Sequence, residues 1–324
     1  MSDLSKIKKP IEVEFKEFQT FFKSLMRSDI KLLNIVIKYL LRQKGKQLRP
    51  ILVLLTAKLL GEINKSTYIG ATMIELMHTA TLVHDDVVDN ANKRRGMFSI
   101  NALWKNKIAV LMGDYLLSKG LLISVENKEF DFLQEISQTV KQMSEGELLQ
   151  IEKSRKLDIN ENIYYEIIKK KTAVLLSACT VLGAKSVKAT TQQINLAREL
   201  GENLGMAFQI KDDLFDIQKI NNTGKPSGND LQEKKITLPL IYSLQNANDK
   251  QKKQILKLIG KSKKNKDDID KIYKFISEKK GVEYATKVMN NYIDKAFKIL
   301  NDFPDNTAKD SYKLLINYIS ERKK

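Results

Sequence analysis

Val83-His84-Asp85-Asp86-Val87-Val88-Asp89 is the stretch that decides how this sequence folds, because its acidic pattern occurs twice. The second copy is Ile210-Lys211-Asp212-Asp213-Leu214-Phe215-Asp216. Each copy lies in an apolar run that predicts a helix. Residues four apart share one face of a helix, so the first and last aspartates of each copy point the same way. The sequence therefore predicts two helices, each with an acidic face.

Two acidic clusters on apolar helices need positive partners. Like charges four residues apart destabilise a helix, and burying them unpaired costs much more. Cations held between the two clusters are the simplest explanation, and oxygen ligands with no Cys and little His nearby suit Mg²⁺. Because Mg²⁺ usually completes its coordination with water and substrate phosphates, we expect a phosphorylated ligand. For one copy alone, a solvated helix face would be an equally good interpretation.

Composition favours a soluble, all-α protein. The chain has 324 residues and five prolines, none of them between Pro50 and Pro226, which favours long helices. The single cysteine, Cys179, cannot form an internal disulfide and fits a reducing cytoplasm. The charged first residues precede no apolar segment, so we expect no signal peptide. No run approaches 18 uncharged apolar residues, which argues against a membrane-spanning helix.

The net charge of +17 comes largely from residues 250–280, where lysines far outnumber acidic residues. Apolar residues recur at helical spacing through this segment, so the lysines are interpreted as solvated faces of helices. No recognition motif accompanies them, and we expect no nucleic-acid partner. A weak attraction to anionic membrane surfaces remains an alternative.

The apolar spacing predicts a succession of helices and two polar loops. The helices are expected over residues 1–25, 29–41, 51–60, 66–90, 100–105, 113–126, 129–152 and 161–182, and from 191 onward. The loops are residues 90–96 and 221–230, and the second is a candidate lid because it carries Lys225. Residues 238–324 read as helices with basic connectors. We expect one domain over 1–324, with a motif-bearing core at about 40–245 and basic helices at about 246–324.

Several basic residues stand near helix ends or the first cluster. Lys46 and Arg49 lie at a helix start, where backbone N–H groups also favour anions. Arg94 and Arg95 can offer forked hydrogen bonds to diphosphate oxygens, and can equally pair with the aspartates before them. His78 lies two turns before the cluster, within reach of a phosphate. The two histidines share no helix face and have no Cys nearby, so a zinc site is not expected.

These motifs resemble the trans-isoprenyl diphosphate synthases, the polyprenyl synthetase family. The resemblance spans residues 40 to 245 and is closest to long-chain, octaprenyl-type polyprenyl diphosphate synthases. It rests on five motifs in family order: Gly45-Lys46-Gln47-Leu48-Arg49-Pro50, the first cluster with Arg94-Arg95-Gly96, Lys171-Thr172, Phe208 to Asp216, and the segments 224–231 and 235–240. Gln47 and Lys234 depart from the usual pattern, but neither replaces a ligand.

The resemblance implies an all-α, single-domain helical bundle around a deep central cavity, the isoprenoid synthase fold, acting as a homodimer. It implies Mg²⁺-dependent condensation of isopentenyl diphosphate onto an allylic diphosphate. The implied metal ligands, for three ions with substrate bound, are Asp85, Asp86, Asp89, Asp212, Asp213 and Asp216. The implied catalytic residues are Asp85, Asp86, Asp89, Lys171, Asp212 and Asp213. Isopentenyl diphosphate would bind Lys46, Arg49, His78 and Arg95, and the allylic diphosphate would bind Arg94, Lys171, Thr172, Gln209, Lys225 and Lys235.

The residues before the first cluster are expected to set product length. If the prenyl tail grows along this helix, one turn corresponds to roughly one isoprene unit, at ~5.4 Å. Small Ala80 and Thr81, with flexible Met77 a turn deeper, imply an open tunnel whose floor lies within residues 116–124. We expect a hexaprenyl to octaprenyl product for a quinone side chain. Alternatively, Ala80 only permits close helix packing.

Three other functions are alternatives to the long-chain synthase. The first is a short-chain farnesyl or geranylgeranyl diphosphate synthase. The second is a non-catalytic regulatory subunit of a heteromeric synthase, although such subunits tend to lose aspartates and none is missing here. The third is a terpene cyclase, whose second metal motif usually differs from the Asp-Asp-X-X-Asp found here.

Overall fold

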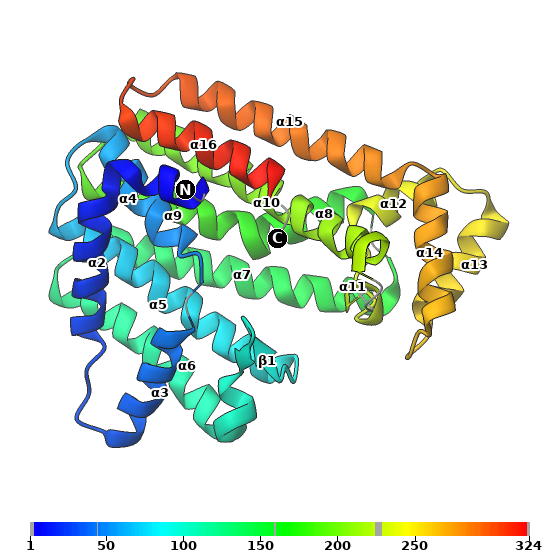
Figure 1. Ribbon diagram of the computed structural model, residues 1–324, viewed down its shortest axis with the longest axis horizontal. Coiled ribbons are helices and arrows are strands. Elements are labelled where there is room, and N and C mark those ends of the chain that lie inside the picture. Colours follow the sequence, from blue (N-terminus) through cyan, green and yellow to red (C-terminus); the bar gives the residue numbers. More distant parts are fainter. Residues whose placement is uncertain (1–2, 44, 159, 224–228, 323–324) are drawn as a thin grey trace. The chain divides into compact units, whose positions relative to one another are not determined.

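The described residues of the computed structural model, 3–43, 45–158, 160–223 and 229–322, are almost entirely helical. Figure 1 shows helices throughout and one small hairpin, labelled β1. The predicted all-α class is therefore confirmed.

The helices follow one another with short connections. The N-terminal half contains α1 (Asp3–Lys8), η1 (Lys9–Ile11), α2 (Glu12–Leu25), α3 (Lys31–Arg42), α4 (Leu48–Leu60), α5 (Lys65–Val88), β1 (Lys93–Arg94), β2 (Met97–Phe98), α6 (Ile100–Glu126) and α7 (Phe130–Lys156). The second half contains α8 (Glu161–Ile168), η2 (Lys169–Ala173), α9 (Val174–Ser186), α10 (Thr191–Thr223), α11 (Asn229–Gln232), α12 (Leu238–Gln245), α13 (Asp249–Gly260), α14 (Lys266–Glu278), α15 (Gly281–Asn301) and α16 (Thr307–Glu321).

By its internal contacts the chain forms two compact units. The first unit comprises Met1–Val140, Ala178–Arg198 and Asp302–Leu314, and it carries the first acidic cluster. The second unit comprises Lys141–Ser177, Glu199–Asn301 and Leu315–Lys324, and it carries the second cluster. The expectation of one domain over residues 1–324 stays a prediction.

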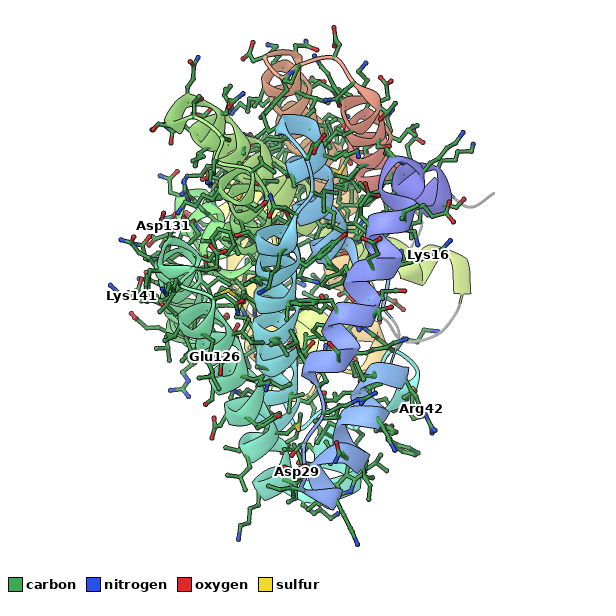
Figure 2. The ribbon with its side chains drawn as sticks, turned by 90° about the vertical axis from the view of Figure 1, so that its left-hand side faces the viewer. Lys16, Asp29, Arg42, Glu126, Asp131 and Lys141 are labelled. Carbon is green, nitrogen blue, oxygen red and sulfur yellow. The ribbon has the colours of Figure 1, made fainter. Side chains whose placement is uncertain are left out.

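The first unit is organised around α4, α5 and α6. Helix α4 is buried on nearly all sides, as its continuous apolar sequence requires. Helices α5 and α6 run side by side (Figure 1). Asn64 caps α5, because its side chain accepts hydrogen bonds from the backbone N–H groups of Ser66 and Thr67. Figure 2 shows Lys16 and Arg42 on the outer surface of α2 and α3.

Several boundaries differ from the sequence prediction. The N-terminal helix is interrupted by the 3₁₀ turn η1 at Pro10, which cannot donate a backbone hydrogen bond. Helix α4 begins at Leu48, so Pro50 lies within its first turn, where no donor is needed. The break expected after residues 100–105 is present within α6, because Lys105 has a non-helical backbone with φ 69° and ψ 168°. The helix resumes directly after Lys105 rather than at the expected residue 113.

Residues 90–96, expected as a polar loop, include half of a two-stranded hairpin. Lys93 pairs with Phe98 and Arg94 with Met97. The two turn residues, Arg95 and Gly96, have φ of 52° and 79°, and a type I′ turn requires positive φ at both positions. The hairpin therefore fixes where the backbone of Arg94 and Arg95 lies after the first acidic cluster.

Helix α6 is the one helix of the described chain with the length and composition to cross a membrane. The sequence had argued against such a helix, because charged residues interrupt every long apolar run. Within its most apolar window 39% of residues are buried. One such helix is weak evidence for a membrane span, because core helices of soluble proteins pass the same test.

In the second unit, the helix expected over 161–182 contains a change of helix type. Five residues, η2, form a π-helical segment between α8 and α9. Helix α10 continues to Thr223 and α11 begins at Asn229, so both ends of the expected 221–230 loop are helical. The candidate lid residue Lys225 lies outside the described residues.

Candidate active site

Asp86 is the buried carboxylate of the first acidic cluster. It lies near the C-terminal end of α5, with its side chain 4% exposed. Arg94 of β1 donates from Nε and Nη2 to Asp86 Oδ1, each at 2.7 Å. Asp85 and Asp89 are exposed on the face that their spacing predicts. The structure thus confirms that Arg94 pairs with an aspartate of this cluster.

Arg95 extends from the hairpin turn to the loop before α4. Its Nη1 donates to the carbonyl oxygen of Gln43 at 3.0 Å. A Cβ atom at Gly45 would lie 2.6 Å from Arg95 Cζ, so glycine at this position leaves the space that the guanidinium occupies. This contact brings Arg95 to the loop that carries the exposed Lys46.

Glu75 is an acidic residue at this site that the sequence analysis missed. Burial raises its pKa, and the charges of Arg49 and Arg95 oppose that rise. Burial, followed by repulsion from Arg49, Arg95 and Arg94, lowers the pKa of His78 well below its usual range. The structure therefore gathers three of the four predicted isopentenyl diphosphate residues around Glu75. The sequence feature that could have revealed Glu75 is its position as a lone carboxylate in an apolar run, one turn before His78.

A cavity of about 120 Å³ lies among α2, α3, α5 and α6. Its charged lining consists of Lys23, Glu75, Asp86, Arg94 and Arg95, and the phenylalanines and leucines of the surrounding helices contribute apolar lining. The described residues that line it do not include Met77, Ala80 or Thr81. This cavity therefore does not test the predicted tunnel.

Ala80 is fully buried on the side of α5 that meets α6. Its neighbours one turn away in the same row are Leu76 and His84. A Cβ atom at Gly120 of α6 would lie 3.9 Å from Leu76 Cβ, and Gly113 of α6 leaves room for the His84 imidazole. This arrangement supports the alternative in which Ala80 permits close packing of the two helices.

Met77 and Thr81 occupy other positions around α5. Met77 is buried, and Thr81 Oγ1 donates to the carbonyl oxygen of His78 at 2.9 Å. Within the expected floor segment, Leu116 and Ile123 are buried. The assignments of tunnel and floor stay predictions.

Asp213 is the buried carboxylate of the second acidic cluster, at 6% exposure. Tyr164 of α8 donates its hydroxyl to Asp213 Oδ2 at 2.6 Å, and Gln209 Nε2 donates to Oδ1 at 2.9 Å. Gln209 Oε1 accepts from Thr172 Oγ1 at 2.7 Å. Burial, then the charge of Asp213, raises the pKa of Tyr164 well above its usual range, so its hydroxyl stays a donor. Gln209 and Thr172 were predicted at this site, whereas Tyr164 was not.

Arg322, just after α16, binds the first aspartate of the second cluster. Its Nη2 lies 2.7 Å from Asp212 Oδ1 and donates to the carbonyl oxygen of Phe208 at 2.9 Å. The guanidinium also lies over the rings of Phe208 and Phe215, 3.8 and 5.3 Å from their centroids. Arg322 stands 110 positions from Asp212, so no local pattern could have revealed it.

Lys171 pairs with a carboxylate from a neighbouring helix. Its ammonium contacts Glu147 of α7 and lies 3.4 Å from Gln150 Oε1. Lys235 likewise pairs with Glu233, and it lines a small cavity together with Asp213 and Asp216. Both predicted phosphate-binding lysines therefore have an acidic partner, and Glu147 is another residue that the sequence analysis missed.

Two glycines allow the neighbouring helices to approach closely the π-helical segment that carries Lys171 and Thr172. A Cβ atom at Gly146 of α7 would lie 3.1 Å from the backbone nitrogen of Lys171. A Cβ atom at Gly205 of α10 would lie 2.9 Å from Ala173 Cβ. Short π-helical segments are frequent at functional sites. Here the segment sets the register in which Lys171 and Thr172 face their neighbours.

The carboxylates of each cluster are suitable ligands for a metal ion, although they do not form a complete coordination shell by themselves. Among the described residues, no three His, Cys, Asp or Glu side chains gather into a metal site. Mg²⁺ commonly takes only one or two protein carboxylates and completes its shell with water and phosphate oxygens. Arg94 and Arg322 balance part of the acidic charge. The donor set therefore suits Mg²⁺ bound together with a phosphorylated ligand.

Comparisons with known proteins identify the family of the chain. A model of the family described as Polyprenyl synthetase matches residues 30–276. The chain is 36% identical to heptaprenyl diphosphate synthase component 2 of Bacillus subtilis, over 92% of this chain and 85% of that protein. It is 31% identical to geranylgeranyl diphosphate synthase of Saccharolobus solfataricus, over 93% and 94% of the two chains.

A solved structure shares the fold across nearly the whole chain. The polyprenyl synthase of Caulobacter crescentus, crystallised with calcium and isoprenyl diphosphate, matches with a TM-score of 0.90 at 29% identity. The match covers 99% of this chain and 98% of that one. Fold and site together define a prenyltransferase with the isoprenoid synthase fold. The chain belongs to the polyprenyl synthetase family and is a prenyl diphosphate synthase.

Proposed function

We propose that the chain is a Mg²⁺-dependent trans-polyprenyl diphosphate synthase that makes a long-chain product of six to eight isoprene units. The observation that carries the reaction is the pair of buried carboxylates, Asp86 and Asp213, each held by strong hydrogen-bond donors. Donors of this kind typically orient the carboxylates that bind a metal ion. The Caulobacter crescentus protein, crystallised with a divalent cation and isoprenyl diphosphate, supports this assignment.

Each group of residues has one role in this proposal. The aspartates of the two clusters hold Mg²⁺, three ions with substrate bound. Isopentenyl diphosphate binds Lys46, Arg49, His78 and Arg95, and the allylic diphosphate binds Arg94, Lys171, Thr172, Gln209, Lys225 and Lys235. Because Arg94, Lys171 and Lys235 pair with carboxylates here, substrate phosphates would replace one negative partner with another.

The reaction follows from these charges. Mg²⁺, when bound, neutralises charge that develops on the departing diphosphate. Arg94 and Lys171 hold the same diphosphate by charge-assisted hydrogen bonds as its C–O bond breaks and an allylic carbocation forms. The double bond of isopentenyl diphosphate attacks that cation and forms the new C–C bond. Loss of a proton to the departed diphosphate then restores a double bond in the lengthened chain.

The long product is supported by small residues before the first cluster and by the similarity to a heptaprenyl diphosphate synthase component. The similarity to a geranylgeranyl diphosphate synthase keeps a short-chain product as the alternative. Because Ala80 packs toward α6, we propose that Thr81 and Met77, at other positions around α5, are the residues that lie beside the growing prenyl tail. We propose a quinone side chain as the destination of the product.

The proposed assembly is a homodimer in the cytoplasm, with no nucleic-acid partner and at most weak contact with membrane surfaces. The buried, lone Cys179 supports a reducing compartment. The Bacillus subtilis relative is named as a component, so the alternative is a subunit that needs a second chain. The complete set of aspartates favours a chain that is active alone.

The decisive experiment is incubation of the purified protein with labelled isopentenyl diphosphate, farnesyl diphosphate and Mg²⁺, with product length read by chromatography. We expect products of six to eight units, abolished by a chelator. Arrest at three or four units, with shorter primers also tested, would favour the short-chain synthase. Absence of turnover with every primer, restored by a second chain, would favour the subunit alternative.

Product length is tested separately by Ala80→Phe and Thr81→Phe. A bulky ring beside the growing tail should shorten the product to three or four units. If Ala80→Phe leaves the product distribution unchanged while Thr81→Phe shortens it, Ala80 serves helix packing only. Unchanged products from both variants would overturn the assignment of the tunnel to this part of α5.

A further inference from the structure

Tyr164 lies outside every motif of the sequence, yet it contacts a residue of the second acidic cluster. Its hydroxyl donates to Asp213 Oδ2 at 2.6 Å, a short bond of the kind that charged acceptors form. Tyr164 is 3% exposed and Asp213 is 6% exposed. Because water has little access to either group, this hydrogen bond is strong and its loss would leave a buried oxygen without its donor.

Three hydrogen bonds are directed toward the Asp213 carboxylate, two directly and one through Gln209. Thr172 donates to Gln209, Gln209 donates to Asp213 Oδ1, and Tyr164 donates to Asp213 Oδ2. Both oxygens of the carboxylate are therefore fixed in place by donors from different elements. A carboxylate has about four lone-pair sites, so it can accept these bonds and still bind a cation. The two bonds constrain the plane of the carboxylate.

We propose that Tyr164 is a positioning residue that fixes the Asp213 carboxylate for binding a divalent cation together with a diphosphate. This inference rests on the proposed role of Asp213 as a Mg²⁺ ligand. Residues that orient a metal ligand typically contribute between ten- and a hundredfold, roughly, to metal affinity or activity.

The next residue in the chain provides a matched control. Tyr165 also lies on α8 and also donates its hydroxyl to a carboxylate, Glu161 Oε1, at 2.5 Å. Glu161 belongs to the same helix and to neither acidic cluster. The rings of Tyr164 and Tyr165 pack edge to face with centroids 5.7 Å apart. Replacing either tyrosine with phenylalanine keeps the ring and removes one hydroxyl bonded to a carboxylate. Only Tyr164→Phe removes a bond to Asp213, and Tyr165 is the less buried of the two.

The experiment compares wild type, Tyr164→Phe and Tyr165→Phe. Binding of Mn²⁺ in the presence of inorganic diphosphate is measured by electron paramagnetic resonance, and the Mg²⁺ dependence of turnover is measured in parallel. For Tyr164→Phe we expect the cation concentration at half-saturation to rise about tenfold or more, with kcat largely restored by excess Mg²⁺. We also expect a lower Tm, because the buried Asp213 carboxylate loses a donor. For Tyr165→Phe we expect a change of less than about twofold.

Equal half-saturation in the two variants would overturn the proposal. A third comparison tests whether Tyr164→Phe acts through Asp213 or only through packing. Tyr164→Phe is also made in an Asp213→Ala chain, where the hydroxyl has lost its partner, and Tm is measured. If Tyr164→Phe lowers Tm equally with and without the Asp213 carboxylate, or prevents folding in both, the hydroxyl serves packing and the proposal is wrong. Failure of wild type itself to bind Mn²⁺ and turn over would instead count against the proposed function.

Discussion

At the scale of single residues, each acidic cluster has one deeply buried carboxylate and partly exposed neighbours. Asp86 is bound by Arg94, and Asp213 is bound by Tyr164 and Gln209. A buried carboxylate costs several kcal/mol, roughly, unless it is paired or hydrogen-bonded. The partners therefore stabilise the folded chain before any ligand arrives, and they determine which carboxylate oxygens remain accessible to a metal ion.

His78 should make stability depend on pH in mildly acidic solution. Burial and three arginines hold its pKa well below the usual value of 6.5. Below about pH 6.5 the unfolded chain binds a proton at this position while the folded chain does not, so stability falls as pH falls, by up to about 1.4 kcal/mol per pH unit. His78→Gln should flatten the fall of Tm between pH 7.5 and 5.5.

The other histidine of the chain serves as the control for this prediction. His84 is 31% exposed, so His84→Gln removes an imidazole that is less buried than that of His78, and the pH dependence of Tm is compared between the two variants. If His78→Gln and wild type lose stability in parallel on acidification, the buried imidazole is not the cause.

Arg322→Gln should destabilise the protein in the absence of metal by about 2 kcal/mol, because it removes a buried ion pair and a cation–π contact. The expected loss of stability is no larger because the Asp212 side chain is 41% exposed, and solvent weakens the ion pair. Urea unfolding measures the change. Lys313→Gln, on the preceding helix α16, breaks the exposed pair with Asp310 and should change stability by less than about 0.5 kcal/mol. Similar losses in the two variants would contradict the special role of Arg322.

At the scale of elements, the π-helical segment η2 depends on the helices beside it. Its backbone is approached closely by α7 at Gly146 and by α10 at Gly205. Neither helix could come so near with a larger residue at these positions. The unusual register of Lys171 and Thr172 is therefore maintained by packing on both sides rather than by local sequence preference.

Gly205→Ala should separate α10 from η2. The new methyl group would lie 2.9 Å from Ala173 Cβ and closer still to the backbone, and such overpacking costs about 1–3 kcal/mol. We expect lower stability and a KM for the allylic diphosphate about tenfold higher, because Lys171 and Thr172 shift by a fraction of an ångström. Steady-state kinetics and urea unfolding test both effects.

Gly120→Ala on α6 is the matched control for Gly205→Ala. The nearest atom to its new methyl group would be 3.9 Å away, an ordinary contact distance. Alanine favours helix over glycine by up to about 1 kcal/mol, so this variant should be as stable as wild type or more so. Normal kinetics in Gly205→Ala would show that the close approach does not position Lys171.

At the scale of the whole molecule, the sequence revealed the helices, both acidic clusters and most cations that accompany them. These features have local patterns: apolar spacing, repeated aspartates and basic residues at helix ends. Tyr164, Glu147 and Arg322 were missed because their roles arise from contacts across long sequence separations. The π-helical segment was missed because apolar spacing does not report a change of helix type.

The exposed side of α6 bears on how whole molecules associate. Val110, Leu111, Leu121, Leu122 and Val125 are each 41–55% exposed. Steps of 11 residues correspond to three helical turns, so Leu111 and Leu122 lie in one row, as do Val110 and Leu121. Contiguous exposed apolar surface of this kind marks a site of association rather than ordinary surface. We therefore expect α6 to form the homodimer contact.

Leu111→Glu combined with Leu122→Glu should convert the dimer to monomers, because dimerisation would bury two uncompensated charges on each chain. Light scattering after size-exclusion chromatography measures the mass, and Val13→Glu on α2, at 64% exposure, should leave the dimer intact. A wild-type monomer that sediments with anionic vesicles, and a double variant that does not, would instead assign this side of α6 to a membrane surface. A dimer that survives both glutamates would place the contact elsewhere.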